Sequence, residues 1–398
     1  MSDKADFISK STEVPSLPEE SISNALKVLK SGKLFRYGEN NIEADFVNRL
    51  EVKFAEIIGC KYAVAVNSGG SAIYIALKAA GIMANEIVAL NVFTLAPVPG
   101  ALENSGAEIT LLEVDKNLTL NTSELEEKLQ YCGAKALVLS HMRGHISNLQ
   151  EIVRICDKLG VILIEDCAHT MGAEYNQKMV GSFGKVGCFS FQTYKQVNSG
   201  EGGILVTDDP DIAAKAILYS GSYMLYSQHE SRPSDEFFLK YRSKIPNYSL
   251  RMNELCASVL GPQLDQLEGR NSRWREIYSI INSGLRQIEG VTTIEADAAV
   301  LMAPTSIQFH IDEVERIPKI INKASDLGLK IKWFGSIEPI GFTSNSNHWE
   351  YISPKAAISP HLVGLCDIRL PVTLDNLECQ EIVEIISRAL KDTKSQTL

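Results

Sequence analysis

Short apolar runs alternate with helix-like stretches over residues 62–207. The helix-like stretches, such as SAIYIALKAAG and SNLQEIVRICDKLG, repeat their apolar positions at helical spacing. Strands that alternate with helices are typical of a mainly parallel α/β sheet covered on both faces, with ligand sites beyond the carboxyl ends of the strands. The predicted strands are 62–66, 86–90, 108–114, 136–140, 161–166, 187–191 and 202–207.

Two amphipathic helices are predicted before this region. The first covers residues 18–33, where Pro18 is placed to open the helix and Gly32 to close it. The second covers residues 41–59 and ends at Gly59. A glycine directly after a helical pattern is a common helix end, because glycine adopts the left-handed conformation of the cap without strain.

The rhythm of the pattern changes after about residue 250. Helical spacing covers 251–289, and the polar, proline-containing segment 227–238 before it is expected to be an excursion or mobile loop. We therefore expect a large domain over 1–250, followed over 251–398 by a linking helix and a smaller α+β domain. Further predicted elements are a strand near 305–310, a helix near 313–327 and a terminal helix near 375–391.

Composition narrows the functional classes. The 398 residues carry a net charge of −10, which argues against non-specific nucleic-acid binding. No apolar run approaches the roughly 20 residues needed to span a bilayer, and the polar N-terminus does not resemble a signal peptide. The eight cysteines are widely spaced and form no Cys-x-x-Cys pair. A reduced, cytoplasmic protein without a membrane or nucleic-acid partner is expected.

Two candidate site motifs follow predicted strands. NSGGSA (67–72) lies between a predicted strand and a predicted helix, where glycines and a helix N-terminus can bind an anion. An ordinary tight turn would have the same sequence pattern, so both interpretations stay open. In IEDCAH (164–169), Asp166 ends an apolar strand, either as a helix N-cap or as a carboxylate that holds a proton on a ring nitrogen. His169 is either structural or a cover for that ring.

A third motif, FSFQTYKQVNSGEGG (189–203), carries a single amine at Lys195, five residues after Ser190. A lysine amine condenses with an aldehyde only when it is neutral, a state that a desolvated or cation-rich site favours. The hydroxyl of Ser190 could contact a phosphate. An anion loop, a strand-end aspartate and a lysine in one α/β sheet suit pyridoxal phosphate, which needs a phosphate cup, a pyridinium partner and an imine-forming lysine.

At these residues the sequence resembles the DegT/DnrJ/EryC1/StrS aminotransferases, pyridoxal phosphate (PLP)-dependent sugar aminotransferases of the aspartate aminotransferase fold (PLP fold type I). The resemblance implies that fold, with a mainly parallel seven-stranded type of sheet in the large domain. It covers nearly the whole chain, and FSF-x₃-K-x₄-GEGG after EDCAH is its most specific part. It also includes SGKLFRYGE (31–39), residues 61–82, residues 92–115 and SLRMNELCASVLGPQLDQLE (249–268).

The resemblance implies a role for each matching residue. Lys195 would bind the cofactor and move protons between substrate and cofactor carbons, and Asp166 would pair with the pyridinium nitrogen. His169 would lie near the ring oxygen, and Phe93 would stack on the ring. The phosphate would be held by Gly69, Gly70, Ser71 and Ser190. The family often has Thr where this chain has Gly70, so Ser71 is expected to compensate for the missing hydroxyl.

The resemblance further implies a homodimer with shared active sites. In the family, an Asn of the Asn-x-Arg-Met element reaches the phosphate of the neighbouring subunit's cofactor. This chain reads Ser249, Leu250, Arg251 and Met252 there, with Asn247 two residues earlier, so either Asn247 or Ser249 takes that part. The lysine at position 195 favours transamination over the dehydratase branch, which carries His at that place.

The substrate is suggested by HMRGH (141–145), where Arg143 stands in a slot that is aromatic in many relatives. Arg143 is either a surface residue, a structural ion pair, or a fork for the carboxylate of the glutamate donor or of an acidic keto-sugar. A metal site at His141 and His145 is not expected, because no carboxylate accompanies them. The variant resembles the branch that makes 8-amino-3,8-dideoxy-octulosonate (8-amino-Kdo) for lipopolysaccharide, with L-glutamate as amino donor in a ping-pong mechanism. A nucleotide-linked 3- or 4-keto-hexose, a keto-inositol, or a non-catalytic PLP-binding regulatory role are the alternatives.

Overall fold

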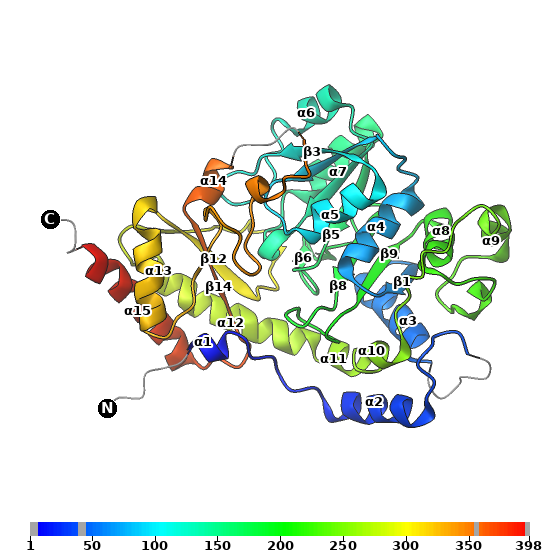
Figure 1. The fold of residues 1–398 in the computed structure, drawn as a ribbon, viewed down its shortest axis with the longest axis horizontal. Coiled ribbons are helices and arrows are strands. Elements are labelled where there is room, and N and C mark those ends of the chain that lie inside the picture. Colours follow the sequence, from blue (N-terminus) through cyan, green and yellow to red (C-terminus); the bar gives the residue numbers. More distant parts are fainter. Residues whose placement is uncertain (1–6, 39–44, 354–357, 395–398) are drawn as a thin grey trace.

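The computed structural model describes residues 7–38, 45–353 and 358–394, and it is built on one large mixed sheet. The strand order is β1-β9-β8-β5-β4-β2-β3, and β9 runs antiparallel to both of its neighbours while the other pairs are parallel (Figure 1). The sheet confirms the predicted α/β fold. Its strands are β1 Tyr62–Val66, β2 Ile87–Asn91, β3 Glu108–Leu112, β4 Ala136–Ser140, β5 Ile162–Asp166, β8 Val186–Ser190 and β9 Gly203–Thr207.

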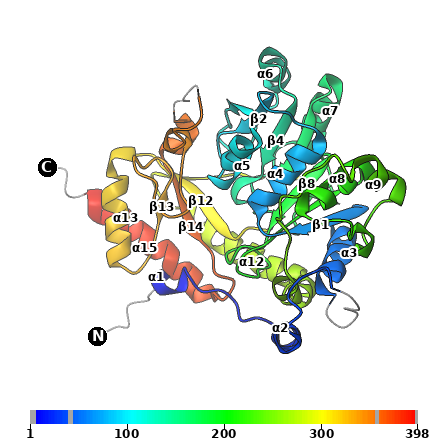
Figure 2. The ribbon, with the colours of Figure 1, turned by 45° about the vertical axis from the view of Figure 1, so that its right-hand side comes forward.

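Both faces of this sheet are covered by helices, which explains why its strands read as continuous apolar runs. Every residue of β4, β8 and β9 is buried. One face packs against α4 Gly69–Ala80, α5 Pro97–Ser105 and α8 Pro210–Ser220. The other face packs against α3 Phe46–Ile58, α6 Leu125–Cys132 and α7 Leu149–Leu159 (Figure 2).

The N-terminal helices end as the sequence predicts. Helix α2, Glu19–Ser31, stops at Gly32 with φ 68°, and α3 stops at Gly59 with φ 78°. A side chain at these positions would be strained, since both glycines adopt the left-handed conformation. Residues 41–44 of the predicted second helix lie outside the described residues.

A second, antiparallel sheet forms the core of the C-terminal part. Its order is β10-β12-β14-β13, and α12, α13 and α15 pack on it together with Phe7 of the short helix α1, Phe7–Lys10. The predicted strand near 305–310 and the helices near 313–327 and 375–391 are therefore confirmed. The bounds are β10 Val291–Thr293, β12 Ser306–Ile311, β13 Lys332–Trp333, β14 Leu365–Arg369, α12 Leu267–Leu285, α13 Ile317–Asp326 and α15 Asn376–Lys394. A 3-10 turn, Val314–Arg316, leads into α13, and α14 Pro360–Val363 precedes β14.

Three local predictions need correction. The helical stretch 251–289 is broken into α10 Glu254–Ser258, α11 Gly261–Asp265 and α12. The segment 227–238 is not a plain loop, because α9, Asp235–Tyr241, begins within it and buries Phe238 completely. A small three-stranded sheet was also missed, since strands of two residues leave no periodicity: β6 Glu174–Tyr175, β7 Lys178–Met179 and β11 Val300–Leu301.

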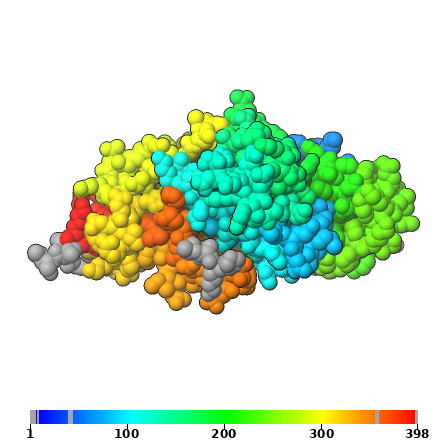
Figure 3. All heavy atoms as spheres, turned by 90° about the horizontal axis from the view of Figure 1, so that it is seen from above, coloured from blue at the N-terminus to red at the C-terminus, as the bar shows by residue number. Residues whose placement is uncertain are grey.

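The two sheets lie side by side (Figures 1 and 2), and Arg143, which follows β4, forms an ion pair with Asp367 of β14. In the space-filling view from above, the yellow and orange C-terminal segments lie directly against the cyan part of the large sheet region (Figure 3). In the described part of the chain, no helix combines the length and the apolar character that crossing a membrane requires.

Candidate active site

Lys195 lies in the loop between β8 and β9, at the carboxyl end of β8. Its Nζ is 3.1 Å from Nε2 of His169. Burial and the nearby Arg143 guanidinium lower the pKa of Lys195 to about 7, against the opposing influence of Asp166. A large fraction of the amine is therefore neutral near pH 7, which is the form that attacks an aldehyde.

Asp166 is the last residue of β5 and is held by two donors. Its Oδ2 accepts a hydrogen bond from the Ser140 hydroxyl at 2.6 Å, and its Oδ1 accepts one from the backbone N–H of Ala168 at 3.1 Å. His169 follows three residues later and is 7% exposed. Burial and Lys195 lower the pKa of His169 well below its ordinary value, so the imidazole is neutral and can accept a hydrogen bond from the Lys195 amine.

The turn between β1 and α4 forms a small anion cradle. Ser68 caps α4, and its side chain accepts a hydrogen bond from the Ser71 backbone N–H at 3.0 Å. Gly69 lies so close to Ser190 that an added Cβ would be 2.8 Å from the Ser190 Cβ. Only glycine therefore lets the helix N-terminus and the Ser190 hydroxyl approach one another. Backbone N–H groups at the start of a helix favour a phosphate.

The cradle, Asp166 and Lys195 line one hollow, which also has apolar walls. The donor set fits pyridoxal phosphate: N–H and hydroxyl groups for the phosphate, a carboxylate for the ring nitrogen, an amine for the aldehyde and apolar side chains for the ring. The lining residues that carry this fit are Ser68, Gly69, Gly70, Ile73, Leu95, Val98, Met142, Asp166, Ala168, His169, Ser190 and Lys195.

Two residues expected at the cofactor lie elsewhere. Phe93 is 1% exposed and packs edge-on against Phe334, with ring centroids 5.2 Å apart, while Leu95 lines the hollow instead. The ring-stacking prediction for Phe93 is corrected accordingly, because the side chain turns into the core beside the second sheet. The Ser71 hydroxyl donates to Asn67 Oδ1 at 2.7 Å and does not line the hollow.

Asn247 and Ser249 lie together on an exposed turn, and neither lines the hollow of this chain. The Ser249 backbone N–H donates to Asn247 Oδ1 at 2.9 Å, and Arg251 donates to the Ser249 hydroxyl at 2.7 Å. Ser249 has φ 59°, a left-handed conformation that holds the turn tight. Both residues stay available at the surface to a second subunit.

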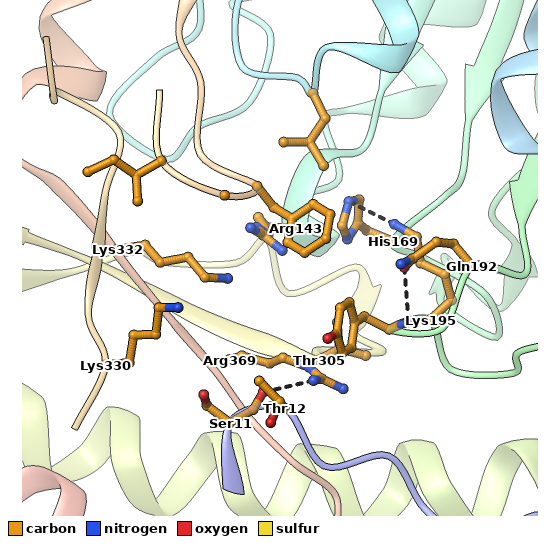
Figure 4. A pocket seen from close by; sticks show the side chains of 15 residues that line it. Ser11, Thr12, Arg143, His169, Gln192, Lys195, Thr305, Lys330, Lys332 and Arg369 are labelled. Atoms are coloured by element: carbon orange, nitrogen blue, oxygen red, sulfur yellow. Dashed lines mark hydrogen bonds between the residues drawn. The ribbon is translucent and has the colours of Figure 1, made fainter. Parts of the chain in front are cut away.

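A second hollow shares Lys195 and His169 with the first and is rich in cations. Figure 4 shows Arg143, Lys332 and Arg369 extending from different elements toward the same space. Arg143 follows β4 with φ 58°, and its Nη2 is 3.2 Å from Oδ2 of Asp367. Among the described residues, neither Nε nor Nη2 of Arg143 has a hydrogen-bond partner although both atoms are buried.

The buried carboxylate of Asp367 organises this hollow from β14. It accepts a hydrogen bond from Gln308 at 2.7 Å and one from Lys332 at 3.4 Å. Burial alone would raise the pKa of Asp367, but Arg143 and Lys332 lower it below its ordinary value, so the group is ionised. Both readings of Arg143 are therefore present, since the guanidinium makes an ion pair and still offers unused N–H donors.

The two histidines near Arg143 point in different directions. His141 Nε2 is 3.2 Å from Glu165 Oε2, and Cys167 lies close to the pair. Glu165 also accepts three backbone hydrogen bonds, which gives it a structural function. His145 Nε2 is 2.8 Å from Oε1 of Gln308, and burial lowers the pKa of His145 to about 4. A carboxylate therefore does accompany His141, so the reason stated against a metal is corrected, while the two histidine rings have different partners.

Several lining residues escaped the sequence reasoning. Ser68 could have been found, because a serine directly before a helix is a common cap. Lys332 and Arg369 come from the second sheet, and nothing in the sequence indicates that they approach a loop some 140 to 170 residues away. Others among them are Ser11, Thr12, Leu95, Gln192, Tyr194, Thr305, Lys330 and Phe342.

Known proteins resemble this chain in sequence and in fold. A sequence profile described as the DegT/DnrJ/EryC1/StrS aminotransferase family matches residues 15–330. The spore coat polysaccharide biosynthesis protein SpsC of Bacillus subtilis (strain 168) is 31% identical over 284 residues, 70% of this chain and 70% of that protein. GDP-perosamine synthase of Escherichia coli O157:H7 is 28% identical over 247 residues, 62% of this chain and 65% of that protein. The solved structure of an aminotransferase from Psychrobacter cryohalolentis shares the fold, with TM-score 0.80, 22% identity and coverage of 96% and 99% of the two chains.

Proposed function

The chain belongs to the DegT/DnrJ/EryC1/StrS aminotransferase family, and we propose that it moves the amino group of L-glutamate to a keto-sugar that carries a carboxylate. It is a PLP-dependent aminotransferase. The observation that carries the acidic acceptor is Arg143, which is buried beside Lys195 in a hollow and keeps N–H donors without partners among the described residues. The ion pair with Asp367 leaves buried N–H groups of Arg143 without a hydrogen bond, which is costly unless a further acceptor such as a substrate carboxylate completes them.

We assign the chemistry to residues of the first hollow. When bound, pyridoxal phosphate supplies an aldehyde and an electron-withdrawing ring that weaken the C–H bond next to the amino group. Asp166, fixed by Ser140 and Ala168, holds the proton of the ring nitrogen. Lys195 takes the α-proton of the donor and later returns a proton to the acceptor carbon, and its pKa of about 7 suits both directions.

His169 keeps the lysine in place between these steps. Its neutral Nε2 accepts a hydrogen bond from Nζ, and its own position is fixed by the Gln196 side chain, which donates to the His169 carbonyl at 3.1 Å. The order of events is ping-pong: glutamate enters and 2-oxoglutarate leaves, and the keto-sugar then receives the amino group at the same lysine.

The acceptor that we propose is 8-keto-3,8-dideoxy-octulosonate, which would give 8-amino-Kdo for lipopolysaccharide. Its carboxylate would meet Arg143, while Lys332 and Arg369 add positive charge to the same hollow. A nucleotide-linked 3- or 4-keto-hexose is the second candidate, favoured by the similarity to GDP-perosamine synthase. A keto-inositol would lack the anionic group that this hollow is suited to bind.

We further propose a homodimer with shared active sites. The exposed turn of Asn247 and Ser249 offers an amide and a hydroxyl, which suit the phosphate of a neighbouring subunit's cofactor. The cytoplasmic location expected from composition stays a prediction.

The decisive experiment is an acceptor screen with L-glutamate as donor, following the release of 2-oxoglutarate. The octulosonate, a nucleotide-linked 4-keto-hexose and a keto-inositol are compared on the parent and on Arg143→Ala. Loss of charged hydrogen bonds to a carboxylate removes about 2–4 kcal/mol of transition-state binding, so kcat/KM for the octulosonate should fall about 30- to 1,000-fold.

The methyl ester of the octulosonate is the matched control, because it lacks the charge and should be affected much less. Arginine and alanine experience the same left-handed backbone at position 143, so the variant adds little backbone strain. Unchanged turnover of the octulosonate by Arg143→Ala, or turnover of the nucleotide-linked sugar alone, would refute the proposed acceptor.

A further inference from the structure

The N-terminal segment 7–13, here called the strap, is anchored on the second sheet region. Phe7 is 3% exposed and belongs to the core beneath α12 and α15. Lys10 forms an ion pair with Glu378 of α15. The strap is therefore docked by both an apolar and a charged contact, and it runs past the mouth of the cationic hollow, where Ser11 and Thr12 form part of the lining.

The strap holds the guanidinium of Arg369. Nη1 of Arg369 donates to the Ser11 carbonyl at 2.8 Å (Figure 4). Nη2 donates to the Glu13 carbonyl at 3.3 Å. On its other side the guanidinium carbon lies 4.0 Å from the ring centroid of Tyr194, the residue before Lys195. Two backbone carbonyls and one ring therefore fix a side chain that would otherwise sample many rotamers.

The fixed guanidinium adds to an unbalanced cluster of positive charge. Arg143, Lys332 and Arg369 line the hollow, and the described carboxylate that pairs with this group is Asp367. Burial lowers the pKa of Lys332, and burial together with Arg143 lowers the pKa of Arg369 to about 10. Cations that repel one another in a partly buried site are stabilised when an anion enters.

We propose that the strap is part of the substrate site: by holding Arg369 beside Arg143 and Lys332, it builds a carboxylate-binding wall that sets which substrates enter. This inference depends on the proposed function in one respect: both assume that the cationic hollow binds the substrate. The family profile covers residues 15–330, so the strap, Lys332 and Arg369 all lie outside it. Of the residues that build the wall, Arg143 lies within the part that the profile matches.

The test uses glutarate, a dicarboxylate that has neither the amino group of the donor nor the keto group of the acceptor. Calorimetric titration into the PLP-loaded enzyme measures its binding without turnover, and the neutral diamide glutaramide serves as the uncharged probe. Deleting residues 1–13 and, separately, Arg369→Gln should each weaken glutarate binding about tenfold or more, the usual effect of losing a charge-assisted contact. Deleting residues 1–6 keeps the strap and is the matched control.

Arg369→Lys covers the case in which the strap-less chain does not fold. It keeps the charge but loses the paired contacts to the strap carbonyls, so its glutarate affinity should lie between those of the parent and of Arg369→Gln. The proposal is overturned if Arg369→Lys binds glutarate as tightly as the parent, or if a folded strap-less chain does so.

The KM values of the same variants show whether the wall binds the carboxylate of the amino donor or that of the acceptor. A higher KM for L-glutamate assigns the wall to the donor, and a higher KM for the acidic acceptor assigns it to the acceptor. In either case kcat should change less than KM. If the parent does not aminate the octulosonate but glutarate binding still depends on the strap, the proposed acceptor is wrong and the strap site stands.

Discussion

The depressed pKa of Lys195 predicts how the stability of the protein without cofactor depends on pH. Below pH 7 the lysine is charged in the folded and in the unfolded chain, so the full destabilisation from burying a cation is present. Between the folded pKa of about 7 and the ordinary 10.5, only the unfolded chain keeps the proton, and stability rises with pH. Above pH 10.5 the lysine is neutral in both the folded and the unfolded chain, so it no longer makes stability depend on pH. Lys195→Met should abolish this rise.

The size of the effect follows from the change in pKa. A fall from 10.5 to about 7 corresponds to a maximum of about 5 kcal/mol. The side chain of Lys195 is only partly buried in this structure, and solvent contact reduces the expected value to about 2–3 kcal/mol. Most of that, about 1–2 kcal/mol, should be regained between about pH 6 and about pH 10, because a smaller total corresponds to a smaller fall in the pKa.

The assay is urea-induced unfolding of the cofactor-free protein, followed by tryptophan fluorescence, at about pH 6 and about pH 10. Lys195→Met should exceed the parent in unfolding free energy at the lower pH by about 1–2 kcal/mol more than at the higher pH. Lys391→Met, at an exposed lysine of α15, corrects for the loss of one positive charge. Parallel pH profiles for the parent and Lys195→Met would refute the assigned ionisation and, with it, the ready supply of a neutral amine.

Two further predictions concern the cradle and the large-domain core. Gly69→Ala would place a Cβ 2.8 Å from that of Ser190, so titration of the cofactor-free protein with pyridoxal phosphate should give a Kd raised about tenfold or more; an unchanged Kd would contradict the cradle. Glu51→Gln leaves the buried Arg36 guanidinium without the carboxylate that binds it at 2.7 and 3.0 Å, and urea unfolding should show a loss of about 3–5 kcal/mol, against about 0–1 kcal/mol for the exposed Glu151→Gln.

The site residues that the sequence identified share one property: each follows an apolar strand of the large sheet. Asp166 ends β5, Ser190 ends β8, and Gly69 begins the helix after β1. Parallel strands bring their carboxyl ends to one edge, so periodicity alone places these residues together. The role that the resemblance implied for Phe93 did not follow from strand position: Phe93 lies in the loop after β2 and packs against Phe334, while Leu95 lines the hollow, a choice made by tertiary packing.

The cationic wall could not be predicted in this way. Lys332 and Arg369 lie on antiparallel strands of the second sheet, and the strap comes from the other end of the chain. Their meeting depends on how one sheet packs against another, which is decided by side-chain fit and by buried pairs such as Arg143 with Asp367. No local pattern records such a contact.

The order of apolar and polar residues by itself determined the α/β architecture, the helix ends and the grouping of a lysine, an aspartate and a glycine turn, because these follow from repeats of two to four residues and from the backbone freedom of glycine. The tertiary structure alone decided the chemistry of the substrate side. Long-range packing buried Arg143 and partly buried Lys195 beside it, lowered the pKa of the lysine, and carried Arg369 across the chain to the same hollow. Burial and charge proximity arise only when distant segments meet, so they are properties of the folded molecule.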